Sequence, residues 1–205
     1  KSVCVVGASS TPGKPGNVVV RNMRDAGFKG KIYLVNPRGG EIEGHKVYQS
    51  IADLPDNIDQ AVVTLPAVGT PDTVRDLGKK GVEAIILAAS GFAEVDQMGE
   101  ALQQDLIAAI RESGARIIGP NTTGHISVPG NYTSSFFPLG KLRRGSVSYI
   151  TQTGNFCGIS MRHILSAENY GIARSCGLGN KADLDECDLL GFYDQDPETK
   201  SIFLY

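Results

Sequence analysis

A short apolar run that stops at a glycine-rich loop constrains the fold of this chain more than any other feature. Residues 3–6, all valine or cysteine, lead directly into residues 7–16, which read GASSTPGKPG, and a helical pattern of valines follows up to Gly27. Open α/β sheets hold phosphate groups with such loops, because glycines let the backbone approach the ligand and the next helix directs its N–H groups at the anion. We therefore predict a strand, a phosphate-binding loop and a helix here.

The loop matches two known phosphate-binding motifs only in part. A dinucleotide fingerprint needs G-x-G-x-x-G, but this loop begins Gly7-Ala8-Ser9. A Walker A loop needs G-x-x-x-x-G-K-[ST]. Lys14 is present after a glycine, but Ala8 stands where the first glycine belongs and Pro15 follows the lysine. The loop alone predicts a phosphate site without identifying the nucleotide.

The residues at the end of the second predicted strand limit which nucleotide can be the ligand. Residues 31–35 form an apolar run that ends in Asn36-Pro37-Arg38. A NAD site would place a carboxylate here for the adenosine ribose hydroxyls, whereas the guanidinium of Arg38 suits a ribose that carries a phosphate. This leaves NADP or coenzyme A (CoA), with a plain turn and a solvated arginine as the alternative interpretation.

The order of apolar runs predicts the fold class. Strands are expected at residues 3–6, 31–35, 60–65, 83–88 and 115–118. Helical patterns separate them, including one at 69–80 that turns Val74 and Leu77 inward and one that places Leu102, Leu106 and Ile110 on one face. Such alternation predicts a Rossmann-like, doubly wound parallel sheet, whose ligands bind at the carboxyl ends of the strands. Residues 41–55 are predicted to be a connecting segment.

A second α/β unit is predicted after a connection at residues 125–144 with little regular structure. Its strands are expected at 146–150, 172–176 and 201–205, and its helices at 183–193 and after Gly154, where Phe156, Ile159 and His163 would face inward. We expect a first domain at 1–124 and a partial second domain at 145–205. Because the chain stops on an apolar strand, we expect a piece of a longer protein.

Composition favours an ordinary cytoplasmic globular protein. The net charge is −2 and 41% of the residues are apolar, which gives no reason to expect nucleic acid or a membrane as partner. No apolar run reaches the roughly 18 residues of a membrane span, and no signal peptide is evident. The cysteines lack C-x-x-C spacing, so reduced, packed thiols are expected rather than disulfides or a metal site. They are Cys4, Cys157, Cys176 and Cys187.

Five motifs in order carry a family resemblance. They are V-V-G-A-S at 5–9, V-N-P-R-G at 35–39, L-P-A at 65–67, A-S-G-F-A-E at 89–94 and I-G-P-N-T-T-G at 118–124. Together they resemble the CoA-binding domain of the NDP-forming acyl-CoA synthetases. That family includes the α part of ADP-forming acetyl-CoA synthetase and, more distantly, succinyl-CoA synthetase α. The resemblance implies a Rossmann-like CoA-binding domain followed by part of a succinyl-CoA-synthetase-like flavodoxin domain.

The resemblance also implies site residues. CoA contacts are expected from Gly7, Ala8, Ser9, Ser10, Lys14, Gly16, Pro37, Arg38, Pro66, Ala67, Ala89, Ser90, Gly91 and Asn121. Asn121 and Thr122 would lie beside the reactive end of CoA, where relatives often have cysteine in place of Thr122. Asn121 could donate to an acyl carbonyl, or it could simply form a turn.

The implied reaction interconverts an acyl-CoA, NDP and phosphate with a carboxylic acid, CoA and NTP, through an acyl phosphate and a phosphohistidine. The turn Thr151-Gln152-Thr153-Gly154 would hold phosphate at a helix start, with plain N-capping by Thr153 as the alternative. None of His45, His125 and His163 lies in a motif like that of the phosphorylated histidine, which is expected beyond Tyr205. Of the three, His125 follows the I-G-P-N-T-T-G motif and is the one expected near the inferred pocket. This chain alone is therefore expected to be inactive. ATP or ADP with Mg is expected on a β-type nucleotide-grasping subunit or domain, and a homo-oligomer is possible.

Two other functions stay open at this point. Some protein-lysine acetyltransferases carry a non-catalytic acyl-CoA-sensing module that resembles this family and lacks the histidine. An NADP-binding protein is disfavoured by the absence of G-x-G-x-x-G.

Overall fold

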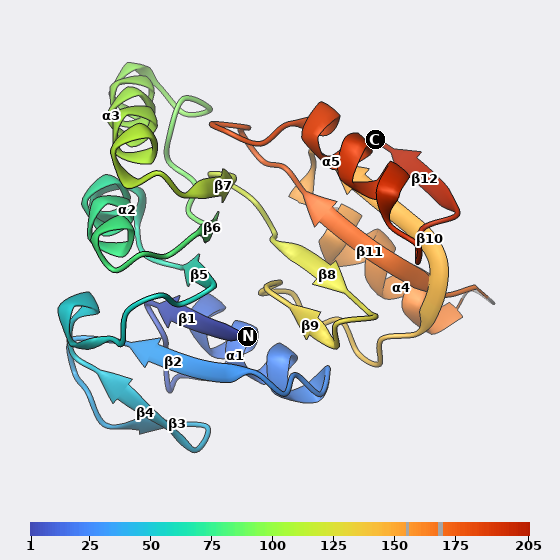
Figure 1. Cartoon of the computed structure of the whole chain (residues 1–205), viewed down its shortest axis with the longest axis horizontal. Helices are drawn as coiled ribbons and strands as arrows, with labels where there is room; N and C mark the ends of the chain where they lie inside the picture. The colour runs from blue at the N-terminus through green and yellow to red at the C-terminus, as the bar shows by residue number, and fades with distance from the viewer. Residues whose placement is uncertain (155, 168–169) are drawn as a thin grey trace.

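The computed structural model describes residues 1–154, 156–167 and 170–205, which form two sheets side by side (Figure 1). The first sheet has the strand order β3-β4-β2-β1-β5-β6-β7. Its strands are β1 (Ser2–Val6), β2 (Lys31–Val35), β3 (Glu41–Ile42), β4 (His45–Tyr48), β5 (Gln60–Val63), β6 (Ala84–Leu87) and β7 (Arg116–Ile118). The five predicted strands are present and parallel, with β1 between β2 and β5, so the Rossmann-like sheet is confirmed.

Residues 41–55 are more than the predicted connection. β4 pairs in parallel with β2 and β3 pairs antiparallel with β4, so the segment extends the sheet by two strands. Ile42 and Val47 are buried, and this burial stabilises both strands. Gly40 and Gly44 have positive φ angles, which permit tight turns. These glycines are the reason that the sequence predicted a loop here.

Helices cover both faces of the first sheet. The helices are α1 (Pro15–Asp25), α2 (Thr70–Lys79) and α3 (Gln97–Ser113), with 3₁₀ turns η1 (Ile51–Asp53) and η2 (Ala67–Gly69). α1 packs its buried valines on one face, and α2 and α3 bury Val74, Leu77 and Leu106 on the other, as predicted. Asp96 caps α3 by accepting a hydrogen bond from the Gly99 N–H at 2.8 Å.

The second sheet has the order β12-β10-β11-β8-β9. Its elements are β8 (His125–Ser127), β9 (Tyr132–Thr133), β10 (Arg144–Thr151), η3 (Phe156–Ser160), α4 (Met161–Ala167), β11 (Ile172–Gly177), α5 (Glu186–Gln195) and β12 (Ser201–Leu204). The prediction of little regular structure at 125–144 is wrong for its first residues, because β8 pairs antiparallel with β11 and β9 with β8. α4 and α5 contribute to separate apolar clusters against this sheet.

The predicted inward face of the helix after Gly154 is confirmed for Phe156, which packs against an apolar cluster, but it is wrong for Ile159 and His163. Ile159 and His163 are exposed, and Met161, Ile164 and Leu165 are buried instead. The reason is that η3 is π-helical, and its wider turns shift the buried face relative to a regular α-helix.

The thiols lie mostly inside. Cys4 and Cys176 are buried thiols, as predicted, whereas the Cys187 thiol is exposed at the start of α5. The side chain of Cys157 lies outside the described residues. No helix in the described ranges is both long and apolar enough to cross a membrane.

The segment between β11 and α5 joins the two halves. The N–H groups of Asn180, Ala182 and Leu184 donate to the carbonyl oxygens of Pro120, Gly119 and Ile117 at 2.8, 2.9 and 3.2 Å. Residues of the second half thereby continue the hydrogen bonding of the first sheet beyond β7. Figure 1 shows this segment reaching from β11 toward the first sheet.

Candidate functional site

A cavity of about 720 Å³, called here the first chamber, lies at the carboxyl ends of β1, β2, β5 and β6. It is lined by Gly7, Ala8, Ser9, Thr11, Lys14, Pro15, Asn36, Arg38, Thr64, Leu65, Pro66, Ala88, Ala89, Ser90 and Phe136. Its volume is in the range of small-molecule sites, and its position is where open α/β sheets bind ligands. Among these lining residues the charged ones are Lys14 and Arg38, so the chamber favours an anion.

The glycine-rich loop is held close to the sheet. The N–H groups of Gly7 and Ala8 both donate to the carbonyl oxygen of Val35, at 3.0 and 3.2 Å. Gly7 has a φ of +90°, and a Cβ on Gly16 would lie 2.1 Å from the Gly7 carbonyl oxygen. Gly16 is buried and outside the chamber lining, so it allows α1 to approach the loop instead of contacting a ligand.

The start of α1 differs from the expected anion site. Pro15 has no N–H, and the N–H groups of Asn17 and Val18 donate to the carbonyl oxygen of Lys14 at 2.9 and 3.0 Å. The positive charges that this chamber offers to an anion are those of Lys14 and Arg38. The Asn17 amide donates to the Ser9 carbonyl at 3.0 Å, while its buried Oδ1 has no partner among the described residues. Asn17 is not among the residues that line the chamber, so this acceptor belongs to the packing of α1 rather than to the ligand site.

The turn after β2 is built by Asn36, which the sequence reasoning did not single out as a site residue. Its Oδ1 accepts from the Arg38 N–H at 2.9 Å, and its Nδ2 donates to the Ala8 carbonyl at 2.8 Å. Asn36 thus fixes the backbone of Arg38 and ties it to the glycine-rich loop. Asparagine before proline is a known turn signal that could have marked this residue.

The other predicted CoA contacts divide into two groups. Gly7, Ala8, Ser9, Lys14, Arg38, Pro66, Ala89 and Ser90 line the first chamber. Ser10 and Pro37 are exposed outside the lining, and Ala67 is buried in the core at the start of η2. Gly91 lies next to Ala67, because a Cβ on Gly91 would be 3.3 Å from that of Ala67. Phe136 lines the chamber but was not predicted.

A second chamber of about 470 Å³ adjoins the first. It is lined by Ala88, Ser90, Asn121, Thr122, Thr123, Phe136, Phe137, Gln152, Thr153 and Gly154. Ala88, Ser90 and Phe136 line both chambers, so the two are direct neighbours. Asn121, with a φ of +58°, donates its backbone N–H to the Ala89 carbonyl at 2.7 Å. The G-P-N-T-T-G stretch and the turn after β10 therefore meet in one cavity.

Two threonines of the second chamber have different roles. The Thr122 hydroxyl donates to the Gly177 carbonyl and accepts from the Gly124 N–H, so it joins the two halves of the chain. The Thr123 hydroxyl is buried and has no partner among the described residues. Thr123, which was not predicted, lines the chamber, but its hydroxyl is packed against Gly177 and its methyl group lies next to Gly154.

The predicted phosphate turn lies only partly in the second chamber. Gln152, Thr153 and Gly154 line it, but Thr151 is 1% exposed and its hydroxyl donates to the Cys176 carbonyl at 3.5 Å. The turn runs into π-helical η3, and Asn155 lies outside the described residues.

The three histidines lie away from both chambers. His125 lines a different cavity of about 410 Å³. This cavity lies beside the first residues of β1, β5 and β6, at the amino ends of these strands, whereas the first chamber lies at their carboxyl ends. The expectation that it lies near the inferred pocket is therefore wrong. His45 is in β4 and His163 is exposed on α4.

Comparison with known proteins identifies the family. Residues 1–127 match the family described as CoA binding domain, which is more than half of the chain. The chain belongs to the CoA-binding domain family. Residues 144–205 of this CoA-binding chain match a second family, described as succinyl-CoA ligase like flavodoxin domain. The predicted boundaries at 1–124, 125–144 and 145–205 stay a prediction.

Relatives of the CoA-binding chain are acid–CoA ligases. It is 39% identical over 209 residues to the alpha subunit of ADP-forming acetate–CoA ligase I from Pyrococcus furiosus, covering 100% of this chain and 45% of that one. It is 37% identical to ADP-forming acetate–CoA ligase II from Archaeoglobus fulgidus, covering 100% and 31%. The dinucleotide forming acetyl-coenzyme A synthetase 1 of Ca. Korarchaeum cryptofilum matches with a TM-score of 0.93 at 39% identity, covering 100% and 44%. The chain spans less than half the length of these relatives.

Proposed function

We propose that this chain is the CoA-binding portion of an NDP-forming acid–CoA ligase. The observation that carries the proposal is that the two chambers are neighbours and share Ala88, Ser90 and Phe136 as lining residues. One extended ligand could bind its phosphorylated end near Lys14 and Arg38 and its reactive end near Asn121. CoA has this form, with phosphates on its nucleotide and a thiol at the other end.

The proposed roles follow from the lining residues. Lys14 and Arg38 bind the nucleotide phosphates of CoA by charge-assisted contacts. Asn121 lies at the thiol end, where its amide can donate to an acyl oxygen. The Gln152–Gly154 turn faces the same chamber and holds phosphate or an acyl phosphate there. Thr122, whose hydroxyl is engaged, contributes its methyl group and backbone to the wall.

We further propose that the acid, ADP or ATP and Mg react at a site completed by another subunit or domain of the nucleotide-grasping type. The ADP-forming ligases among the relatives support this assignment. The full reaction would convert an acyl-CoA, ADP and phosphate into the acid, CoA and ATP, or the reverse, in the cytoplasm.

Calorimetric titration of the chain with CoA and, separately, with NADP tests the assignment of the ligand. We expect CoA to bind and NADP to bind more weakly, because NADP places a nicotinamide nucleotide where CoA extends a narrow thiol-bearing arm. Tighter binding of NADP would overturn the proposal.

A further inference from the structure

Glu94 follows the Ser90-Gly91 turn but is not among the residues that line either chamber. Its Oε1 accepts from the Gly91 N–H at 2.7 Å, and its Oε2 accepts from the Phe92 N–H at 3.2 Å. The carboxylate thus fixes the turn that carries Ser90, a residue common to both chambers. A side chain outside the cavity therefore sets the shape of its wall.

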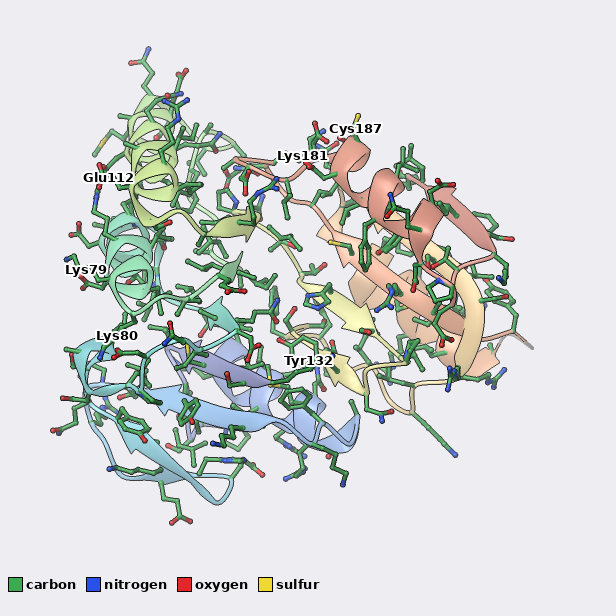
Figure 2. All side chains as sticks on the ribbon, viewed as in Figure 1. Lys79, Lys80, Glu112, Tyr132, Lys181 and Cys187 are labelled. Carbon is green, nitrogen blue, oxygen red and sulfur yellow. The ribbon has the colours of Figure 1, made fainter. Side chains whose placement is uncertain are left out.

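The same carboxylate contacts the second half of the molecule. Asn180, between β11 and α5, donates from Nδ2 to Glu94 Oε2 at 2.5 Å and to Gln103 Oε1 at 3.1 Å. Asn180 Oδ1 in turn accepts from Asn121 Nδ2 at 3.4 Å, and its N–H donates to the Pro120 carbonyl. One asparagine therefore connects the Glu94 turn to the Asn121 wall of the second chamber. Figure 2 labels Lys181, the next residue of this segment.

The charge state of Glu94 suits this arrangement. Partial burial raises the pKa of its carboxyl, but hydrogen bonds from the Gly91 N–H and the Asn180 amide outweigh this and hold the pKa below its usual value. The ionised carboxylate has only acceptor sites, and the Gly91, Phe92 and Asn180 groups are all donors.

We propose that Glu94 is a positioning residue that couples the Ser90-Gly91 turn to Asn180 and so keeps the two chambers aligned for CoA. The ligand in this statement rests on the proposed function, whereas the coupling of the two halves does not. Loss of the coupling would let the turn and the Asn121 wall move independently, and a ligand that spans both chambers would bind more weakly.

Reversal of the hydrogen bond provides a stringent test. In Glu94→Gln an amide NH₂ group can face the Asn180 NH₂ group, and in Asn180→Asp two carboxylates face each other. In the double variant the new amide at position 94 can donate to the new carboxylate at position 180, so this contact is restored with donor and acceptor exchanged, whereas the Phe92 N–H loses its acceptor in both variants that carry Glu94→Gln. We expect each single variant to bind CoA about tenfold more weakly in calorimetry, and the double variant to recover to within about threefold of wild type. Glu100→Gln, at an exposed carboxylate on α3, serves as the matched control and should bind like wild type.

Hydrogen exchange of residues 178–184 gives a readout that does not require CoA. Exchange should be faster in both single variants and return toward the wild-type rate in the double variant. If wild type fails to bind CoA while this exchange pattern holds, the proposed function fails and the coupling stands. If the double variant shows the sum of the two single effects, or if no variant changes exchange, the coupling is refuted.

Discussion

At the scale of single residues, Arg38 has a backbone that is fixed by a hydrogen bond and a side chain that is exposed. Asn36 fixes the Arg38 N–H at 2.9 Å, while the side chain is exposed at the chamber rim. Because the guanidinium is exposed, it can bind a phosphate without first breaking a buried ion pair. The 3′-phosphate of CoA is the group that we expect it to contact.

Arg38→Ala should weaken CoA binding by about 1.5–3 kcal/mol, the usual contribution of a hydrogen bond to a charged group. Binding of dephospho-CoA, which lacks the 3′-phosphate, should hardly change. Calorimetry with both ligands measures the difference, and Arg111→Ala on the exposed surface of α3 is the control. Equal losses for the two ligands would contradict the proposed contact.

How far a residue's role could be predicted depended on where its partner lies in the sequence. Lys14 and Arg38 lie in the loops that follow β1 and β2, so the rule that ligands bind at strand ends was enough to find them. Phe136 could not be found in this way, because it comes from the connection between the two sheets and reaches the chamber only after folding. Glu94 was visible in a motif, but its role depends on Asn180, a residue 86 positions later.

At the scale of elements, the β8–β9 hairpin places a titratable group between the two sheets. His125 Nδ1 lies 3.1 Å from the Ser134 hydroxyl, and its ring packs against Tyr132, which Figure 2 shows between the two halves. Burial, and secondarily the positive charge of Arg174, lower the pKa of His125 to about 4. His125 therefore becomes protonated at a lower pH in the folded state than in the unfolded chain, where it takes up a proton near pH 6.5.

This shift predicts a loss of stability in acid. Above pH 6.5 His125 is neutral in both states and contributes nothing; as the pH falls from 6.5 toward 4, only the unfolded state gains the proton. The free energy of unfolding should fall by about 2 kcal/mol at pH 5 through this group. Urea unfolding at about pH 7.5 and 5 compares wild type with His125→Asn, which keeps a polar group and cannot titrate. Equal losses in the two proteins would show that His125 is not responsible.

Whether an element could be predicted likewise depended on whether it is determined by local sequence or by contacts with distant residues. Strands β1, β2, β5, β6 and β7 are continuous apolar runs and could be predicted from their composition. The exposure of Ile159 could not, because the π-helical turn depends on packing that the local pattern does not contain. β8 and β9 are short. β8 pairs with β11, which lies far along the chain, and β9 pairs with β8.

At the scale of the whole molecule, the chain should bind CoA and catalyse nothing by itself. None of its three histidines lies among the described residues that line the two chambers. With a carboxylic acid, CoA and ATP, we expect no thioester above the blank and no label on the protein from γ-phosphate. A complete ADP-forming acetate–CoA ligase in the same assay provides the positive control. Label on His125, or thioester formed by this chain, would contradict the prediction.

The hydrogen bonds from residues 180–184 to the carbonyl oxygens of Ile117, Gly119 and Pro120 have a consequence for any attempt to divide this molecule. A piece cut after the first sheet would expose those oxygens along an open edge, where another chain can pair with them and seed aggregation. We therefore expect a piece that ends after β7 to self-associate more readily than the whole chain. Engineering a minimal CoA sensor from this chain would require the β11–α5 segment to be kept.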